Sequence, residues 1–216
     1  GRMLKLPKIA IIDYRMSNMF SIKNAMDMLG FESGVTSDHK EIMSADGAIL
    51  PGVGSFSEAM KHINAMDLAV PITEFISSGK HFMGICLGLQ LLFSESEEFG
   101  YTSGLGVIEG KVESLERHDG IRRVPHVGWN SVEKRGSIEN NAIASSLEGI
   151  ASGEYFYFVH SYYVNPVKDC DVYTTTEYRG FEFCSSILSD NVFASQFHPE
   201  KSGEAGLKVL RDFFTK

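Results

Sequence analysis

The stretch HFMGICLGLQLLF, from His81 to Phe93, decides how this 216-residue chain folds. An apolar strand enters Gly84-Ile85-Cys86-Leu87-Gly88, and an amphipathic helix, LGLQLLF, leaves it. The two glycines are needed because side chains at those positions would collide across so tight a bend. Free N–H groups at the helix start favour a thiolate. The pattern predicts that Cys86 is a nucleophile at a strand-to-helix turn, whereas a cysteine without these glycines is more often an inert buried thiol.

Strand and helix signals alternate on the amino-terminal side of this turn. The expected strands are Lys8–Asp13, Phe31–Val35, Gly47–Leu50 and Lys80–Ile85, and the expected helices are 18–29, Ser55–His62 and Pro71–Ser78. Asn18 is the expected cap of the first helix, and Gly30 follows its end. The alternation predicts a doubly wound, flavodoxin-like, mainly parallel sheet.

The carboxyl-terminal half has a different pattern. Between Gly106 and His198, β-branched and aromatic residues gather in successive stretches such as YFYFVHSYYV and FEFCSSIL, which predict an antiparallel extension of the sheet. A last helix is expected over 202–214. We expect a single domain over 8–216, preceded by a cloning scar and lead-in over 1–7.

The partners that a thiol nucleophile needs occur in FASQFHPEKSG, from Phe193 to Gly203. His198 and Glu200 are two positions apart, so both side chains leave an extended chain on the same side. The carboxylate would orient the imidazole, and the other ring nitrogen would face Cys86. Seven histidines make a His-x-Glu pair weak evidence by itself, and a surface histidine is the alternative.

A glycine-rich loop, Pro51-Gly52-Val53-Gly54, follows the third expected strand. Its glycines let the backbone approach a ligand and present N–H groups to a developing oxyanion. By itself the loop could equally be an ordinary turn between strand and helix. It does not match a phosphate-binding or dinucleotide-binding pattern.

The composition excludes several classes of function. Twenty basic against 28 acidic residues give a net charge of −8, which argues against a nucleic-acid partner. No apolar run is long enough to span a membrane, and no signal peptide is visible. Three cysteines without C-x-x-C spacing indicate neither a disulfide framework nor a metal site, so we expect a cytoplasmic protein without metal or cofactor.

In their order and spacing, PGVGSF, GICLGLQLLF and SQFHPEKS resemble the motifs of triad-type (class I) glutamine amidotransferases. HVGWN (126–130) and YFYFVHSYY (155–163) further resemble the glutaminase subunits of imidazole glycerol phosphate synthases. The resemblance covers the chain from Ile9 to the last helix. It implies hydrolysis of glutamine to glutamate, with ammonia channelled to a separate (β/α)₈ cyclase subunit, as a heterodimer, in histidine biosynthesis.

The resemblance also assigns residues. Cys86, His198 and Glu200 would be the triad. Backbone N–H groups of Leu87 and of the Gly52–Val53 strand would hold the oxyanion, and that strand would have to flip to present its donor. Residues expected around the bound glutamine are Gln90, Ser161 and Tyr162, and those expected near the cyclase are Trp129, Tyr157 and Lys201. The alternatives are an exposed Gln90, strand-end roles for Ser161 and Tyr162, a core Trp129 and a solvated Lys201.

One loop departs from the family pattern, because Arg15 and Ser17 stand where two glycines are usual. This keeps open a paralogue that supplies ammonia for amidino sugars of surface glycans. Other amidotransferase branches and γ-glutamyl hydrolases would share the triad, but HVGWN and FVHSYY favour the imidazole glycerol phosphate branch. An α/β-hydrolase fits less well, and a non-catalytic regulator with this fold is hard to reconcile with an intact Cys, His and Glu set.

Overall fold

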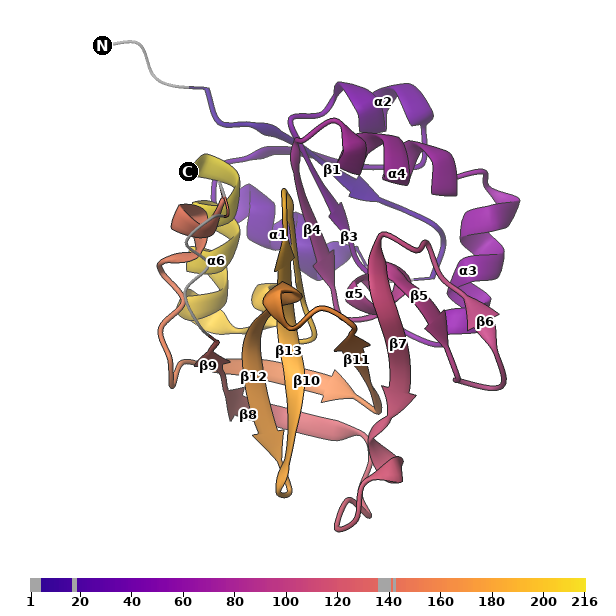
Figure 1. Ribbon diagram of the computed structural model, residues 1–216. Helices are drawn as coiled ribbons and strands as arrows, with labels where there is room; N and C mark the ends of the chain where they lie inside the picture. The colour runs from indigo at the N-terminus through magenta and orange to yellow at the C-terminus, as the bar shows by residue number, and fades with distance from the viewer. Residues whose placement is uncertain (1–4, 17–18, 136–140, 142) are drawn as a thin grey trace.

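A long mixed sheet organises the molecule in the computed structural model, which describes residues 5–16, 19–135, 141 and 143–216 (Figure 1). Along the sheet the strands follow the order β2-β1-β3-β4-β14-β13-β11-β7-β5-β6, with β12 and β9 attached beside β13. A separate pair, β8 and β10, packs at one end of the molecule.

The first half of this sheet is parallel. Its strands are β1 (Lys8–Ile12), β2 (Glu32–Thr36), β3 (Gly47–Leu50), β4 (His81–Ile85) and β14 (Val192–Ser195). The order β2-β1-β3-β4-β14 is that of a doubly wound sheet of the flavodoxin type, and it confirms the predicted fold class. Every residue of β3 and β14 is buried, which explains why these strands are apolar runs without alternation.

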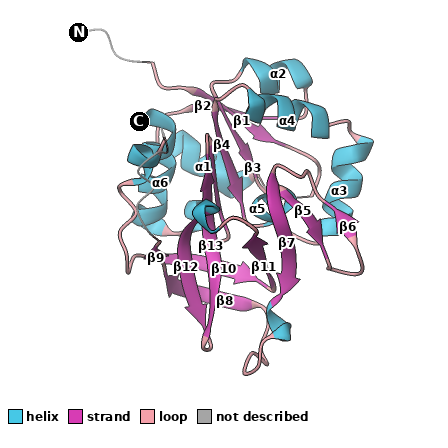
Figure 2. Cartoon of the chain, viewed as in Figure 1, coloured by secondary structure: helices cyan, strands magenta, loops and turns pink. Residues whose placement is uncertain are grey.

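Helices cover both faces of the parallel half (Figure 2). One hydrophobic cluster joins one face to α1 (Phe20–Met28) and α6 (Gly203–Thr215). The other cluster joins the opposite face to α2 (His39–Ser44), α3 (Phe56–Ala65) and α4 (Ala69–Ser77). Among the described helices, none combines the length and the apolar character needed to cross a membrane.

The second half is mainly antiparallel, as the sequence predicts. Its strands are β5 (Phe93–Ser96), β6 (Thr102–Ser103), β7 (Ile108–Ser114), β9 (Glu133–Lys134), β11 (Tyr162–Pro166), β12 (Val172–Tyr178) and β13 (Phe181–Ser189). The separate pair is β8 (His126–Ser131) with β10 (Tyr155–His160). Short 3₁₀ turns are η1 (Leu115–Arg117), η2 (Ala144–Leu147), η3 (Asp169–Asp171) and η4 (Pro199–Lys201). Strand β13 joins the two halves, because β14 and β11 pair with successive parts of one of its edges while β12 pairs along the other.

Some local predictions were wrong. The helix after Cys86, α5, covers only Leu87–Leu91, and the chain then enters β5, because backbone N–H groups of residues 105–108 bind the carbonyls of residues 91–93. All five residues of α5 are buried, so it is not amphipathic. The expected cap Asn18 lies outside the described residues, and α1 begins after Met19.

Candidate functional site

The turn after β4 holds Cys86 in the left-handed region, with φ 55° and ψ −113°, as the strand-to-helix pattern predicts. The flanking glycines are required by close contacts. A Cβ on Gly88 would lie 1.8 Å from the Leu50 carbonyl oxygen, and one on Gly84 would lie 3.1 Å from the Cβ of Ala194. The Cys86 N–H donates to Ser195 of β14 at 2.7 Å. The strands β3 and β14, on either side of the bend, therefore keep Cys86 in this strained backbone conformation.

His198 and Glu200 follow β14 and meet inside the protein. The Nδ1 of His198 lies 2.5 Å from Oε1 of Glu200, and both side chains are at most 4% exposed. Glu200 belongs to η4, so the two side chains meet through a 3₁₀ turn and not along an extended strand as predicted. The His198 N–H donates to the carbonyl of Tyr157, and the Ser202 hydroxyl donates to the carbonyl of His198. These bonds fix the backbone of His198 from β10 and from the start of α6, and Glu200 holds its ring.

The protonation of His198 is set by its neighbours. Burial by itself lowers the pKa of this imidazole, but the nearby Cys86 and Glu200 outweigh it and raise the pKa to about 10. Nε2 makes no hydrogen bond to the described part of the chain, so Nδ1 is the paired nitrogen of this ring. An imidazolium beside a thiol favours the thiolate, which is the reactive form of cysteine. The geometry thus brings together the three residues that the sequence predicts as a triad.

Backbone donors lie beside the thiol. Leu87 is the first residue of α5, and Gly52 and Val53 follow β3 on the neighbouring strand. Among the described residues, the N–H groups of these three have no protein acceptor. Free N–H groups that converge on a nucleophile can stabilise an oxyanion. A cavity of about 50 Å³, lined in part by Gly52, Val53, His198 and Glu200, separates this strand from η4.

A chain of buried amides links the thiol to β11. The Gln196 Nε2 donates to the sulfur of Cys86 at 3.6 Å. The Gln90 Nε2 donates to Oε1 of Gln196 at 3.1 Å and to the Tyr162 carbonyl at 3.3 Å. Gln90 is only 5% exposed, which rules out the exposed helix residue that was the alternative for it. Ser161 is half-buried beside Tyr162, and its carbonyl accepts from the N–H of Leu115.

Sequence reasoning missed Glu98, a carboxylate that is 7% exposed. Burial raises its pKa, while a hydrogen bond from the Phe56 N–H lowers it in part. Burial raises the pKa of the Tyr162 hydroxyl, and the charge of Glu98 adds to this rise. The sequence shows only that Glu98 lies in the loop after β5. A charged residue in such a loop is usually interpreted as solvated, so its burial was not predicted.

Two buried histidines extend the network behind Tyr162. The His160 Nδ1 donates to the Tyr162 carbonyl at 2.8 Å, and its Nε2 lies 2.9 Å from Nδ1 of His126. The Nε2 of His126 lies 3.2 Å from the amide nitrogen of Asn130. Burial lowers the pKa of His126 to about 4 and that of His160 to about 3. Both rings are therefore neutral. In each ring one nitrogen donates a hydrogen bond and the other accepts one, so all donors along this network point toward the Tyr162 carbonyl.

Aromatic side chains gather on the outer face of the β8–β10 pair. Trp129 is 55% exposed and lies edge-on to Tyr157, with ring centroids 6.2 Å apart. Val127 and Tyr155 are also exposed on this face, and Lys201 is exposed beyond it. The core packing that was the alternative for Trp129 is thus wrong.

The loop that departs from the family pattern keeps the usual backbone at one of its two positions. Arg15 has φ 68°, in the region that glycine favours, and its N–H donates to the carboxylate of Asp13 at 2.8 Å. Such a conformation costs an arginine about 1 kcal/mol. Ser17 lies outside the described residues.

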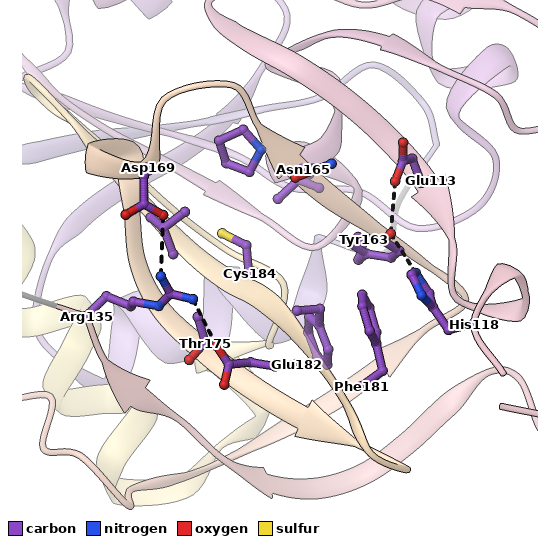
Figure 3. Close-up of a pocket in the computed structure, with 14 residues that line it drawn as sticks. Glu113, His118, Arg135, Tyr163, Asn165, Asp169, Thr175, Phe181, Glu182 and Cys184 are labelled. Carbon is purple, nitrogen blue, oxygen red and sulfur yellow. Dashed lines mark hydrogen bonds and ion pairs between the residues drawn. The ribbon is translucent and has the colours of Figure 1, made fainter. Parts of the chain in front are cut away.

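A larger cavity, about 390 Å³, lies away from the triad between β7, β11, β12 and β13 (Figure 3). Arg135 pairs there with Asp169 and Glu182, and Tyr163 links Glu113 to His118. Cys184 lines the cavity, but burial raises the pKa of its thiol to about 12. In the described part of the chain no imidazole acts on the pKa of this thiol, which sets it apart from Cys86.

Comparison with known proteins shows which family the sequence resembles over almost its whole length. The model of the family "Glutamine amidotransferase class-I" matches residues 10–216. The imidazole glycerol phosphate synthase subunit HisH of Caldanaerobacter subterraneus subsp. tengcongensis is 46% identical over 205 residues, which is 95% of this chain and 96% of the relative. The protein of the same name from Moorella thermoacetica is 48% identical over 207 residues, which is 95% of this chain and 93% of that protein.

Solved structures share the fold. The structure of PurLQS from Thermotoga maritima superposes with a TM-score of 0.72 at 21% identity, covering 96% of this chain and 97% of that one. A crystal structure described as a glutamine amidotransferase gives a TM-score of 0.70 at 18% identity, with 95% and 96% of the two chains covered. At these identities the likeness extends to the fold alone.

Proposed function

The chain belongs to the class-I glutamine amidotransferase family, and we propose that it is the glutaminase subunit of an imidazole glycerol phosphate synthase, active in histidine biosynthesis. The observation that carries this proposal is the buried constellation of Cys86, His198 and Glu200, assembled from the segment after β4 and the segment after β14. Near-complete coverage at more than 40% identity to subunits of that name supports the choice within the family.

In the first half of the reaction the Cys86 thiolate attacks the side-chain amide carbon of glutamine. The oxygen of the tetrahedral intermediate accepts from the N–H of Leu87 and from the Gly52–Val53 strand. The His198 imidazolium gives its proton to the leaving nitrogen, so ammonia departs and a glutamyl thioester remains on Cys86.

In the second half His198 is neutral and takes a proton from an attacking water. The hydroxide adds to the thioester carbon, the carbon–sulfur bond breaks, and glutamate leaves while Cys86 returns to the thiolate. Glu200 keeps Nδ1 protonated and stabilises the imidazolium that forms in this step.

Groups around Tyr162 are suited to the amino-acid end of glutamine. The buried Glu98 carboxylate can pair with the α-ammonium group, and such a pair would compensate its burial. Ser161 and Tyr162 present backbone and hydroxyl groups near it, and Gln90 holds the Tyr162 carbonyl in place. Glutamine would thus lie between the loop after β5 and the turn that carries Cys86.

The released ammonia would pass to a (β/α)₈ cyclase subunit bound as a heterodimer, which makes imidazole glycerol phosphate and an aminoimidazole carboxamide ribotide. The exposed aromatic face with Trp129 and Tyr157, continued by Lys201, is the surface we assign to this partner. Such an exposed patch of aromatic residues is typical of interaction sites. The three cysteines are free, which suits a cytoplasmic enzyme.

The test is glutamate release from glutamine by the chain alone, with the cyclase, and with the cyclase and its ribonucleotide ligand. We expect a large rise that requires both. Cys86→Ala should abolish release and leave partner binding intact, whereas Cys184→Ala, a matched change at another buried cysteine, should remain active. A Cys86→Ala variant that turns over like the wild type would refute the assignment of the nucleophile.

The two other functions considered above are less favoured. A supplier of ammonia for surface glycans would respond only to a different cyclase-like protein in the same assay. A non-catalytic regulator would release no glutamate with any partner and would leave Cys86 unreactive toward a glutamine-like electrophile. Eight similar relatives carry the name of the imidazole glycerol phosphate synthase subunit, which supports the first choice.

A further inference from the structure

We propose that Tyr14 is a positioning residue for the oxyanion-binding strand, because its buried hydroxyl holds the peptide between Pro51 and Gly52 in one orientation. The inference rests on the proposed glutaminase function and adds a residue outside the triad, in the loop where Arg15 and Ser17 depart from the family pattern.

The hydroxyl of Tyr14 makes one strong contact in the protein interior. Tyr14 follows β1, is 0% exposed, and donates from Oη to the Pro51 carbonyl at 2.6 Å. Burial, with a smaller effect from the charge of Cys86, strongly raises the pKa of this phenol. The phenol therefore stays neutral and remains a donor at any pH at which the enzyme works.

The same hydroxyl occupies the space that a side chain at position 52 would need. A Cβ on Gly52 would lie 1.9 Å from Tyr14 Oη, whereas the next atoms, the Cβ of Leu87 and the Cζ of Tyr14, would lie 3.1 and 3.2 Å away. The φ of Gly52 lies outside the left-handed region, so its backbone conformation is open to alanine. The glycine is thus required by the Tyr14 hydroxyl more than by backbone geometry.

Holding the carbonyl of Pro51 also fixes the adjacent donor. In a planar trans peptide the C=O and N–H point in opposite directions, so the orientation of the Pro51 carbonyl sets that of the Gly52 N–H. This N–H and that of Val53 have no protein acceptor among the described residues and border the cavity beside His198. Catalytic donors act best when they are oriented before the charge develops.

Removing the hydroxyl would leave the Pro51 carbonyl buried without a partner. A buried unpaired carbonyl favours any rotation that finds a new donor. The Pro51–Gly52 peptide would then sample several orientations, so the Gly52 N–H would be in place for only part of the time, and the flip expected of the Gly52–Val53 strand would begin from a peptide without a fixed orientation. Cys86 itself bonds to β14 and Gln196, so we expect the loss of the Tyr14 hydroxyl to leave the reactivity of the thiol unchanged.

The first test compares Tyr14→Phe with Tyr173→Phe in the complex with the cyclase and its ligand. Tyr173 is a matched control, since its buried hydroxyl also donates to a backbone carbonyl, that of Leu147 at 3.2 Å. We expect Tyr14→Phe to lower kcat for glutamine by about tenfold to a hundredfold, with KM nearly unchanged and the alkylation rate of Cys86 by iodoacetamide unchanged. Tyr173→Phe should leave all three unchanged. A kcat for Tyr14→Phe equal to or above the wild-type value, or an equal loss in the control, would overturn the inference.

The second test does not depend on activity. Gly52→Ala should lower the unfolding temperature by about 3 to 10 °C in the wild-type background, because the new methyl group overlaps the Tyr14 hydroxyl. In the Tyr14→Phe background the same substitution should cost much less. Equal losses in the two backgrounds would refute the contact on which the inference is built. If the wild-type complex releases no glutamate, the proposed function is refuted, but the difference between the two backgrounds would still support the contact between Tyr14 and Gly52.

Discussion

Replacing Glu200 by glutamine removes a full negative charge from the triad and keeps an oxygen that can accept the Nδ1–H of His198. The two groups are 2.5 Å apart and nearly without solvent exposure, so water screens their interaction little. An isosteric substitution therefore separates the effect of the charge from that of the hydrogen bond.

The expected magnitude follows from the raised pKa of His198, about 10 in the intact triad. A neighbouring carboxylate raises the pKa of an imidazole by about 1 to 3 pH units, so Glu200→Gln should lower the pKa of His198 to between about 7 and 9. At pH 8.5 the imidazolium fraction then falls from about 97% to between about 75% and 3%. Because the imidazolium protonates the leaving ammonia, the loss of activity should grow as the pH rises.

The measurement is kcat/KM for glutamine between pH 6.5 and 9.5 in the activated complex. We expect the basic limb of the profile to move by at least about 1 pH unit toward lower pH in Glu200→Gln. Glu182→Gln is the control, since it removes a carboxylate that pairs with Arg135 on the exposed surface at 2.9 Å. A basic limb that stays in place, or a loss that is equal at every pH, would show that Glu200 acts through geometry alone and would refute the electrostatic reasoning.

Three further predictions concern stability. Gly88→Ala should destabilise the fold by at least about 2 kcal/mol in denaturant unfolding, because its Cβ would lie 1.8 Å from the Leu50 carbonyl oxygen; an unchanged midpoint would contradict this contact. Because the pKa values of His126 and His160 are lowered in the folded protein, the unfolded state binds more protons than the folded state below pH 6.5. The free energy of unfolding should therefore fall as the pH drops from 6.5 toward 4, by up to about 1.4 kcal/mol per pH unit for each ring. Unfolding measured at pH 6.5 and 5 should show this slope, and replacing both rings by glutamine should reduce it. Phe197→Ala should cost about 3 to 5 kcal/mol, since this fully buried ring packs among other aromatic rings; a loss below about 1 kcal/mol in thermal unfolding would show that the site collapses around the cavity.

Local patterns in the sequence predicted much of the fold and the triad. Alternating strand and helix signals predicted the parallel half, and the glycines around Cys86 predicted its turn, because tight bends leave a direct mark on composition. The short helix after Cys86 was not predictable, since its end is set by backbone bonds from residues 105–108, a segment distant in sequence. Periodicity alone continued the helix to Phe93.

The parts of the site that sequence reasoning missed are all held by long-range contacts. Glu98 looks like a surface charge until the loop after β5 folds onto the start of α3. Gln196 stands in the stretch SQFHPEKS and Tyr14 in the loop after β1, but only the packing of β14 and β3 against the turn gives their side chains partners. The exposure of Trp129 was equally hidden, because the β8–β10 pair lies outside the main sheet and has one uncovered face.

The position of β14 has a consequence for biosynthesis of the protein. This strand pairs with β4 from Val192↔Phe82 to Ser195↔Ile85, yet it is the last strand to be made. Until it is synthesised, β4 has an open apolar edge, and such edges promote aggregation. The base of the triad arrives in the same segment, three residues beyond the strand. An incomplete chain thus has a thiol without a base, and a molecule becomes able to release ammonia only when its sheet is closed.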